Sequence, residues 1–385
     1  MMLKRRTAKS LGVLLVLMPF CALSCSGCRT AFESATWDAR PGRLLNGRAA
    51  VVYSSRYEID LWGFEKSHSF DIHKYRRMAR ALVDGGYLAA PDFFVPGEVS
   101  DEMLLSVHTP EYLAKLRSPS NVGRYLENGA VAILPSGTVD DRLLTAFRVT
   151  TGGTVLAARL AWQCGLGINL GGGYHHAHAD HGEGFCIYAD VPIAVRQLQR
   201  EGLLRRVLLV DLDVHQGNGN ARIFAGDRDV FTFSIHQEDL YPKPKATSDL
   251  DRGLWLPVDD EAYMEVLTEE LPSLLDDHKP ELVVVLAGVD TYRGDPLAGF
   301  GMTIEGIVAR DEYAVGQARR RGIPVLHVTS GGYSQEAWRI QYLSIANLLT
   351  KFAGVSLPAD RAAEADAAPS KLAPTTAKSA KGKQP

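Results

Sequence analysis

The stretch Val207-Leu208-Leu209-Val210-Asp211-Leu212-Asp213-Val214-His215 begins with four apolar residues and ends with acids and an imidazole. The apolar residues do not alternate with polar ones, so they predict a β-strand that is buried on both faces. The same argument predicts strands at residues 167–170, 230–233, 282–286 and 323–328. Helical spacing of apolar residues fits the segments 189–201, 261–276, 303–321 and 335–352. This alternation predicts an α/β fold of three layers, in which helices cover a central, mainly parallel sheet.

The composition is that of a globular protein with a large core. The chain has 385 residues, of which 46% are hydrophobic, and this excludes collagen-like, disordered and polytopic membrane proteins. Its 42 Lys and Arg residues nearly balance 45 Asp and Glu residues. Such a balance predicts no nucleic-acid partner, because binding to phosphates needs a concentrated basic surface. Three of the five cysteines lie within the first 28 residues, which is not the pattern of a disulfide framework.

The two ends of the chain differ from its body. In residues 1–30, basic residues precede an apolar run that is short for a membrane span, so we expect an export leader. Small residues around Cys25 and Cys28 resemble a lipoprotein signal, whose lipid would anchor a periplasmic or membrane-bound protein. An uncleaved anchor or a cytoplasmic location is the alternative. Residues 356–385, rich in Ala, Pro and Lys, are predicted to be a disordered tail, which leaves 42–355 as one folded domain.

Polar side chains follow four of the predicted strands. The carboxyl ends of parallel strands meet at one edge of a sheet, and sites form in the crevice beyond that edge. We therefore expect one pocket to collect the residues at these strand ends, which are His175 and His176, then Asp211, Asp213 and His215, then Asp290, and finally Tyr333.

Asp213 and His215 are two residues apart, so on extended backbone their side chains would leave the same face and share one cation. Asp211 would point the same way. Together with Asp290 from another strand end, they would supply three protein ligands and leave a position open for water, as in a catalytic zinc site. Two carboxylates and one imidazole also suit iron(II). The alternative interpretation is that these acids only cap the following helix and hold loops together.

His175 and His176 form a tandem pair after a run of glycines. We expect adjacent imidazoles to diverge, so that only one of them faces a bound water and takes its proton. His178 and His181 continue this histidine-rich loop, and a solvated loop of this kind would have only incidental metal affinity. Tyr333, which follows two glycines, is a candidate oxyanion donor, or else a tyrosine packed at a turn.

In their order along the chain, these motifs resemble the zinc-dependent histone deacetylases of the arginase/deacetylase fold, and most closely their class IV branch. The similarity extends over segments 51–54, 65–71, 107–113, 151–154, 171–190, 211–220, 288–299 and 329–333. The resemblance implies that 42–355 is a catalytic domain in which Asp213, His215 and Asp290 bind zinc.

The resemblance also implies roles for the neighbouring residues. His176 would be the general base and His175 its companion imidazole, with Asp211 as the buried partner of His175. Asn218 would contact His176. Many relatives have Asp at that position, so His176 should be less basic here than beside a carboxylate. Tyr333 would polarise the carbonyl of the substrate.

The family likeness implies a narrow tube for the acyl-lysine chain, with Gly184 and Phe185 in its wall. It also implies a structural potassium ion beside the Asp211 strand, with Ser234 in a matching place. Cys186, next to Phe185, is expected to pack in the wall and not to act as a nucleophile.

The implied reaction is metal-assisted hydrolysis of an amide, which removes an acetyl or longer fatty acyl group from lysine or a related amine. Hydrolysis needs no organic cofactor, and the expected partner is an acyl-lysine peptide or an acylated amine. Two alternatives remain, a two-manganese ureohydrolase of the same fold and a non-catalytic module that binds acyl chains or metal. The ureohydrolase would usually need another Asp two residues from Asp290, where this chain has Tyr292.

Overall fold

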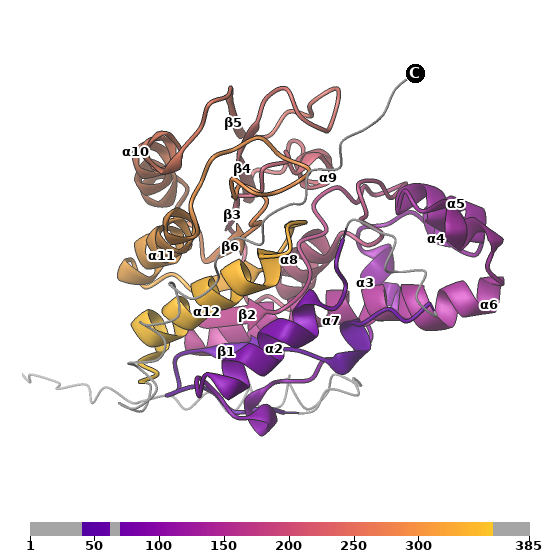
Figure 1. Cartoon of the computed structure of the whole chain (residues 1–385), viewed down its shortest axis with the longest axis horizontal. Helices are drawn as coiled ribbons and strands as arrows, with labels where there is room; N and C mark the ends of the chain where they lie inside the picture. The colour runs from indigo at the N-terminus through magenta and orange to yellow at the C-terminus, as the bar shows by residue number, and fades with distance from the viewer. Residues whose placement is uncertain (1–40, 62–69, 357–385) are drawn as a thin grey trace, which may run out of the picture. The chain divides into compact units, whose positions relative to one another are not determined.

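The computed structural model describes residues 41–61 and 70–356 (Figure 1). The predicted leader at 1–30 and all but the first residue of the predicted tail lie outside these described residues. Within them, no helix is both long enough and apolar enough to span a bilayer.

Seven strands of the described chain form one sheet, in the order β1-β2-β7-β6-β3-β4-β5. Every neighbouring pair is parallel, which confirms the predicted sheet. All residues of β1, β2, β3, β6 and β7 are buried, so these strands are covered on both faces. The strands are β1 Ala50–Val52, β2 Leu166–Asn169, β3 Val207–Asp211, β4 Val230–Gln237, β5 Leu250–Leu254, β6 Leu282–Leu286 and β7 Val325–Val328.

Helices cover both faces of the sheet, as a three-layer fold requires (Figure 1). On one face α2, α12, α11 and α10 pack side by side in that order, and α7 and α8 pack together on the other. The longer helices are α2 Lys74–Asp84, α7 Thr145–Cys164, α8 Asp190–Arg200, α10 Asp260–His278, α11 Ile304–Arg320 and α12 Ala337–Ala353. The shorter ones are α3 Asp101–Leu105, α4 Pro110–Lys115, α5 Pro119–Tyr125, α6 Ser136–Val139 and α9 Asn218–Ile223.

Local chemistry sets the helix ends. The side chain of Asp259 accepts a hydrogen bond from the backbone N–H of Ala262 and starts α10. Thr303 caps α11 in the same way, by accepting from Gly306. Gly165 ends α7 with a φ of 99°, a left-handed conformation that favours glycine. The chain can then turn directly into β2, which leads to the site.

Candidate metal centre and active site

Asp213, His215 and Asp290 meet beyond the carboxyl ends of β3 and β6, which are neighbours in the sheet. Nδ1 of His215 lies 3.1 Å from Oδ1 of Asp213 and 3.2 Å from Oδ2 of Asp290, and all three residues are buried. The expectation of extended backbone was wrong. β3 ends at Asp211, and the chain bends through 213–215. The two side chains therefore converge because of the bend and not because of strand alternation.

The donor atoms of this cluster fit one divalent cation. Oδ2 of Asp213 accepts a hydrogen bond from the N–H of Gly331 at 2.8 Å, and Oδ1 of Asp290 accepts one from the N–H of Val214 at 2.9 Å. The other oxygen of each carboxylate faces Nδ1 of His215. At metal–ligand distances of about 2.0–2.2 Å, the ligands of a tetrahedral site lie about 3.3–3.6 Å apart. The observed separations of 3.1 and 3.2 Å are close to this spacing.

Two glycines leave room around the carboxylates. A Cβ atom on Gly288 would lie 2.2 Å from Oδ2 of Asp213, and one on Gly331 would lie 2.2 Å from Oδ2 of Asp290. Burial and the neighbouring charge of Asp213 raise the pKa of Asp290 to about 7. Two buried carboxylates repel each other unless a positive charge lies between them, so a bound cation would offset this repulsion. Space, donor type and charge therefore all suit a metal ion.

The expectation that the paired imidazoles diverge was also wrong. His175 and His176 occupy a turn after β2, and their ring centroids are only 4.1 Å apart. Gly172 and Gly173 lead into this turn with φ values of 82° and 78°. A Cβ atom on Gly173 would also collide with the backbone of Ser330, 2.7 Å away. The glycine run therefore allows the backbone path that leads into the turn, where the two rings lie close together.

The two imidazoles differ in charge because their partners differ. Nδ1 of His175 donates to Asp211 at 2.8 Å, whereas Nδ1 of His176 donates to the amide oxygen of Asn218 at 2.7 Å. Burial alone would lower the pKa of His175, but the charges of Asp211 and Asp213 outweigh it and raise this pKa to about 9. Burial, and then the charge of His175, lower the pKa of His176 well below its ordinary value. His176 is therefore a neutral imidazole whose Nε2 can accept a proton.

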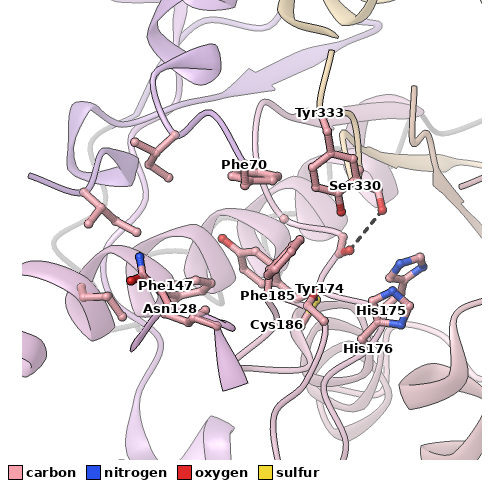
Figure 2. Close-up of a pocket in the computed structure, with 18 of the residues that line it drawn as sticks. Phe70, Asn128, Phe147, Tyr174, His175, His176, Phe185, Cys186, Ser330 and Tyr333 are labelled. Atoms are coloured by element: carbon pink, nitrogen blue, oxygen red, sulfur yellow. Dashed lines mark hydrogen bonds between the residues drawn. The ribbon is translucent and has the colours of Figure 1, made fainter. Parts of the chain in front are cut away.

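A narrow apolar cavity of about 90 Å³ opens beside the two imidazoles (Figure 2). Figure 2 shows His175 and His176 at one end, Phe147 and Asn128 toward the other, and Phe70 and Phe185 between them. Its remaining lining includes Ile59, Leu61, Ile72, Tyr75, Leu126, Val131, Leu143, Tyr174, Gly184, Cys186 and Tyr333.

Tyr333 connects the cavity to the metal-ligating cluster. Its ring centroid lies 5.9 Å from that of Phe185 and 6.1 Å from that of His215. Burial and the charge of Asp290 raise the pKa of Tyr333 well above its ordinary value, so the phenol keeps its proton and can donate it in a hydrogen bond. Phe185 has a φ of 66°, which is unusual for a residue other than glycine and is typical of functional sites.

Sequence reasoning missed several residues that support the site. Asp190 accepts from the N–H groups of Gly173 and Tyr174, both at 2.8 Å, and so fixes the loop before the histidines. The buried Lys74 donates to the carbonyl oxygen of Ser330 at 3.1 Å. Only their contacts reveal these roles, because Asp190 looks like a helix start and Lys74 looks like a surface residue of α2.

The potassium prediction is not tested by the contacts. Ser234 lies opposite Asp211 in the register of β4 and β3, and its hydroxyl contacts Nδ1 of His236 at 2.9 Å. The ion itself stays a prediction.

Comparison with curated proteins gives relatives over most of the chain. Histone deacetylase 2 of Arabidopsis thaliana is 36% identical over 321 residues, which cover 80% of this chain and 83% of the relative. An uncharacterized protein of Picosynechococcus sp. is 38% identical over 292 residues, or 76% of this chain and 94% of the relative. A probable deacetylase of Methanothermobacter thermautotrophicus is 30% identical over 300 residues, or 74% and 86% of the two chains.

A solved structure and a family match agree with these relatives. The crystal structure of the HDA15 HD domain covers 79% of this chain and 91% of its own, with a TM-score of 0.64, and at 22% identity it supports the fold. Residues 68–349 match the family described as the histone deacetylase domain, and this match includes every strand-end residue of the site. The chain therefore belongs to the histone deacetylase domain family and is a hydrolase that acts on amide bonds.

Proposed function

We propose that this protein is a zinc-dependent amidohydrolase that removes an acyl group from a lysine side chain or a related amine. One observation carries the proposal. The donor atoms of Asp213, His215 and Asp290 lie beside the neutral imidazole of His176, and Tyr333 joins them to an apolar cavity. The ring centroids of His176 and His215 are 5.9 Å apart, so a reacting carbonyl could meet both groups at once.

The roles of the residues follow from their contacts. When bound by Asp213, His215 and Asp290, Zn²⁺ supplies Lewis-acid chemistry that polarises a carbonyl and lowers the pKa of water. His176 accepts the proton of the attacking water at Nε2, because its Nδ1–H is held by Asn218. The phenol of Tyr333 donates to the oxygen that becomes negative as the carbonyl is attacked.

The remaining steps return this proton. The oxygen of the water adds to the acyl carbon, the carbon–nitrogen bond breaks, and protonated His176 gives its proton to the leaving amine. His175, whose Nδ1 donates to Asp211, lies beside His176 and can stabilise the negative charge that develops. Asp211 and Asn218 act as positioning residues, since each holds one imidazole.

The donor set favours one cation over the pair of a ureohydrolase. A second cation would need a further carboxylate at the cluster, and the residue two positions after Asp290 is Tyr292. Zinc and iron(II) both accept two oxygens and one nitrogen, so metal-defined assays are needed to choose between them.

The cavity favours an acyl group longer than acetyl. Its lining is almost entirely apolar from the histidines to Phe147, so it offers apolar surface for the methylenes of a long acyl chain as well as for those of lysine. Asn218, the side-chain partner of His176, is the feature on which the class IV resemblance rests. A preference for long acyl chains is part of that resemblance.

We expect the zinc-loaded full-length protein to hydrolyse myristoyl-lysine peptides faster than acetyl-lysine peptides, because the longer chain buries more apolar surface in the cavity. Initial rates on matched peptides measure this. Equal or higher acetyl turnover would discard the long-chain preference. If neither peptide nor acylated polyamines are hydrolysed, the proposed zinc-dependent removal of acyl groups from lysine or related amines is wrong.

Two variants on one short segment connect this preference to the cavity. Val131 is buried in the lining, whereas Ile133 is 82% exposed. Val131→Phe places a ring in the cavity and should lower the ratio of myristoyl to acetyl turnover by roughly 10-fold. Ile133→Phe makes a comparable change outside the cavity and should leave the ratio as it is.

We also propose that the protein is exported and held at a membrane by a lipid on Cys25 or Cys28. This proposal rests on the sequence of residues 1–30, which lie outside the described residues. An exported enzyme would meet acylated small amines or envelope lysines and not histones.

A further inference from the structure

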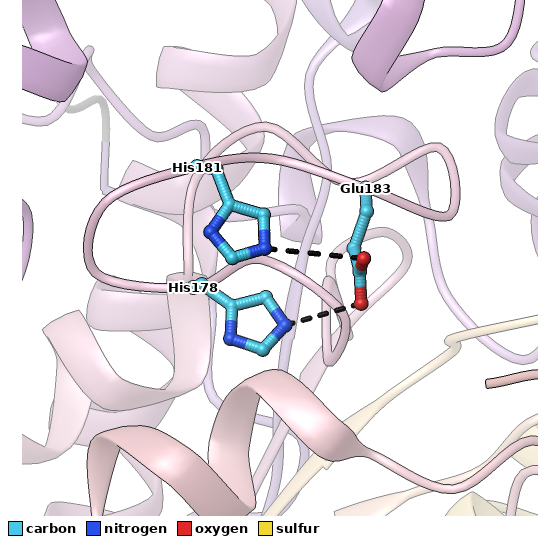
Figure 3. A group of neighbouring side chains, drawn as sticks. All are labelled: His178, His181 and Glu183. Atoms are coloured by element: carbon cyan, nitrogen blue, oxygen red, sulfur yellow. Dashed lines mark hydrogen bonds and ion pairs between the residues drawn. The ribbon is translucent and has the colours of Figure 1, made fainter. Parts of the chain in front are cut away.

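A second group of metal-ligating side chains lies on the loop that follows His176 (Figure 3). His178, His181 and Glu183 come from six consecutive residues, and none of their donor atoms belongs to the Asp213 cluster. The N–H of His178 donates to the carbonyl oxygen of His181 at 2.9 Å, and the N–H of Cys186 donates to that of Glu183 at 2.9 Å. The backbone therefore fixes the loop at both ends of the group.

The three side chains point at a common place. Nε2 of His178 lies 3.1 Å from Oε1 of Glu183, and Nε2 of His181 lies 3.9 Å from Oε2. The two rings are stacked with centroids 4.1 Å apart and planes at 8°, so both present Nε2 to the carboxylate (Figure 3). One donor atom from each of the three residues falls within 4.8 Å of the other two, a spacing that small side-chain rotations bring to that of a zinc site.

A further carboxylate orients one of the imidazoles. Nδ1 of His181 lies 2.7 Å from Oδ1 of Asp180, which leaves Nε2 facing Glu183. Metal-ligating histidines commonly donate their second ring N–H to a carboxylate, which fixes the orientation of the imidazole. The side chains of His181 and Glu183 are 39% and 33% exposed, so an ion and a water ligand can reach them.

This group touches the catalytic machinery through one amide. Nδ2 of Asn218 donates to Oε1 of Glu183 and lies 3.3 Å from Nε2 of His178. The other end of the same amide, Oδ1, accepts from His176. Glu183 therefore helps to fix which way the amide faces, and whatever binds Glu183 acts on the residue that holds His176.

We propose that His178, His181 and Glu183 bind a second divalent cation of the zinc class, at a site separate from Asp213, His215 and Asp290. Two imidazoles and one carboxylate are donors for zinc, cobalt or nickel, and a water would complete a tetrahedral site. The bound cation draws Oε1 of Glu183 away from Asn218, so the hydrogen bond that orients His176 weakens. Occupation of the second site therefore lowers turnover, an effect that rests on the proposed function, whereas the binding itself does not.

Metal counting tests the site directly. Metal-stripped full-length protein is dialysed against Zn²⁺ at micromolar concentrations, and bound zinc per chain is measured by atomic absorption. We expect His181→Ala to bind one zinc fewer than the wild type, and to keep the zinc that is lost in Asp290→Asn. Equal zinc content in His181→Ala and the wild type would overturn the proposal, and then the group is only a hydrogen-bonded loop.

Two further variants sharpen the result. Asp180→Asn should weaken the second zinc by about 10–100-fold while leaving its number unchanged, since the orienting carboxylate is lost. His73 also has a glutamate neighbour, since its Nδ1 lies 3.7 Å from Oε2 of Glu58. It is far from the loop in sequence and belongs to neither group of metal-ligating residues. His73→Ala should keep the wild-type zinc content, so a loss there would mean that the count does not report on the loop.

The effect of the second zinc on turnover is measured separately. As the second zinc binds, turnover of the wild type should fall and turnover of His181→Ala should not respond. A second zinc that binds without any change in turnover would overturn the connection through Asn218. If the protein hydrolyses no acyl-amine at all, the proposed function fails, and the zinc count still decides whether the second site exists.

Discussion

Asp290→Ala is expected to remove the catalytic metal and to lower turnover by roughly 10³–10⁵-fold. Asp290 supplies one of the three donors and is completely buried. Without it, Asp213 and His215 offer only two ligands, which is fewer than zinc keeps in catalytic sites. Lewis-acid stabilisation is worth several kcal/mol, and each 1.36 kcal/mol corresponds to a factor of ten in rate. Zinc content and initial rates on an acyl-lysine peptide measure both effects.

The control separates loss of the ligand from damage to the fold. Oδ1 of Asp290 accepts from the N–H of Val214 at 2.9 Å, and alanine would leave this buried donor without a partner. Asp290→Asn keeps the size of the side chain and an oxygen for Val214 but loses the charge, so it should fold and still lose the metal. Normal zinc content with full activity in either variant would mean that Asp290 is not a ligand.

His176→Ala is expected to keep the metal and to lower turnover by about 10²–10⁴-fold, the range for loss of a general base. Its imidazole is not among the three donors of the cluster, and its nearest hydrogen-bond partner is Asn218. We therefore expect metal content and the midpoint of thermal unfolding to stay near the wild-type values, whereas kcat on the same peptide falls. A variant that loses zinc would make His176 a ligand, and one with turnover near that of the wild type would remove it from the mechanism.

Asn218→Ala is the matched comparison for His176→Ala. It removes the amide that holds the imidazole and leaves the imidazole in place, so its loss of turnover should be smaller than that of His176→Ala. Equal losses would mean that the orientation of His176 contributes as much as its chemistry.

The central strands could be predicted because a strand that is buried on both faces has a continuous apolar sequence. β3 and β6 are continuous runs of Val and Leu apart from the aspartate that ends β3, and their predicted bounds differ from the observed ones by at most one residue. β5 was missed because it lies at the edge of the sheet, where Asp251, Arg252 and Gly253 interrupt its apolar pattern. β1 has only three residues and offers too short a pattern.

Helix α7 was not predicted, for a different reason. α7 carries Gly152 and Gly153 near its middle, and glycine inside a helix usually weakens the prediction. A Cβ atom on Gly152 would lie 2.2 Å from the carbonyl oxygen of Gly97, and one on Gly153 would lie 1.9 Å from the hydroxyl of Tyr57. The glycines are required by close packing with distant segments, which the sequence alone does not reveal.

As with the strands and helices, one part of the site could be predicted from the sequence and another part could not. Parallel strands bring their carboxyl ends together, so strand-end position alone was enough to place Asp213, His215 and Asp290 in one group. The local path of the chain was not predictable, because a bend after Asp211 replaces the extended backbone that we expected there, and a turn at His175 brings together two rings that we expected to diverge. Glu183, Asp190 and Lys74 form contacts across the fold and leave no local pattern.

A crystal structure of the zinc-loaded protein, with anomalous diffraction data collected at the zinc absorption edge, would test directly whether Asp213, His215 and Asp290 bind the metal. We expect an anomalous peak that lies within about 2.0–2.2 Å of Oδ1 of Asp213, Oδ2 of Asp290 and Nδ1 of His215. If the protein is active and zinc-loaded but has no peak at these three atoms, they are not the ligands of the catalytic metal.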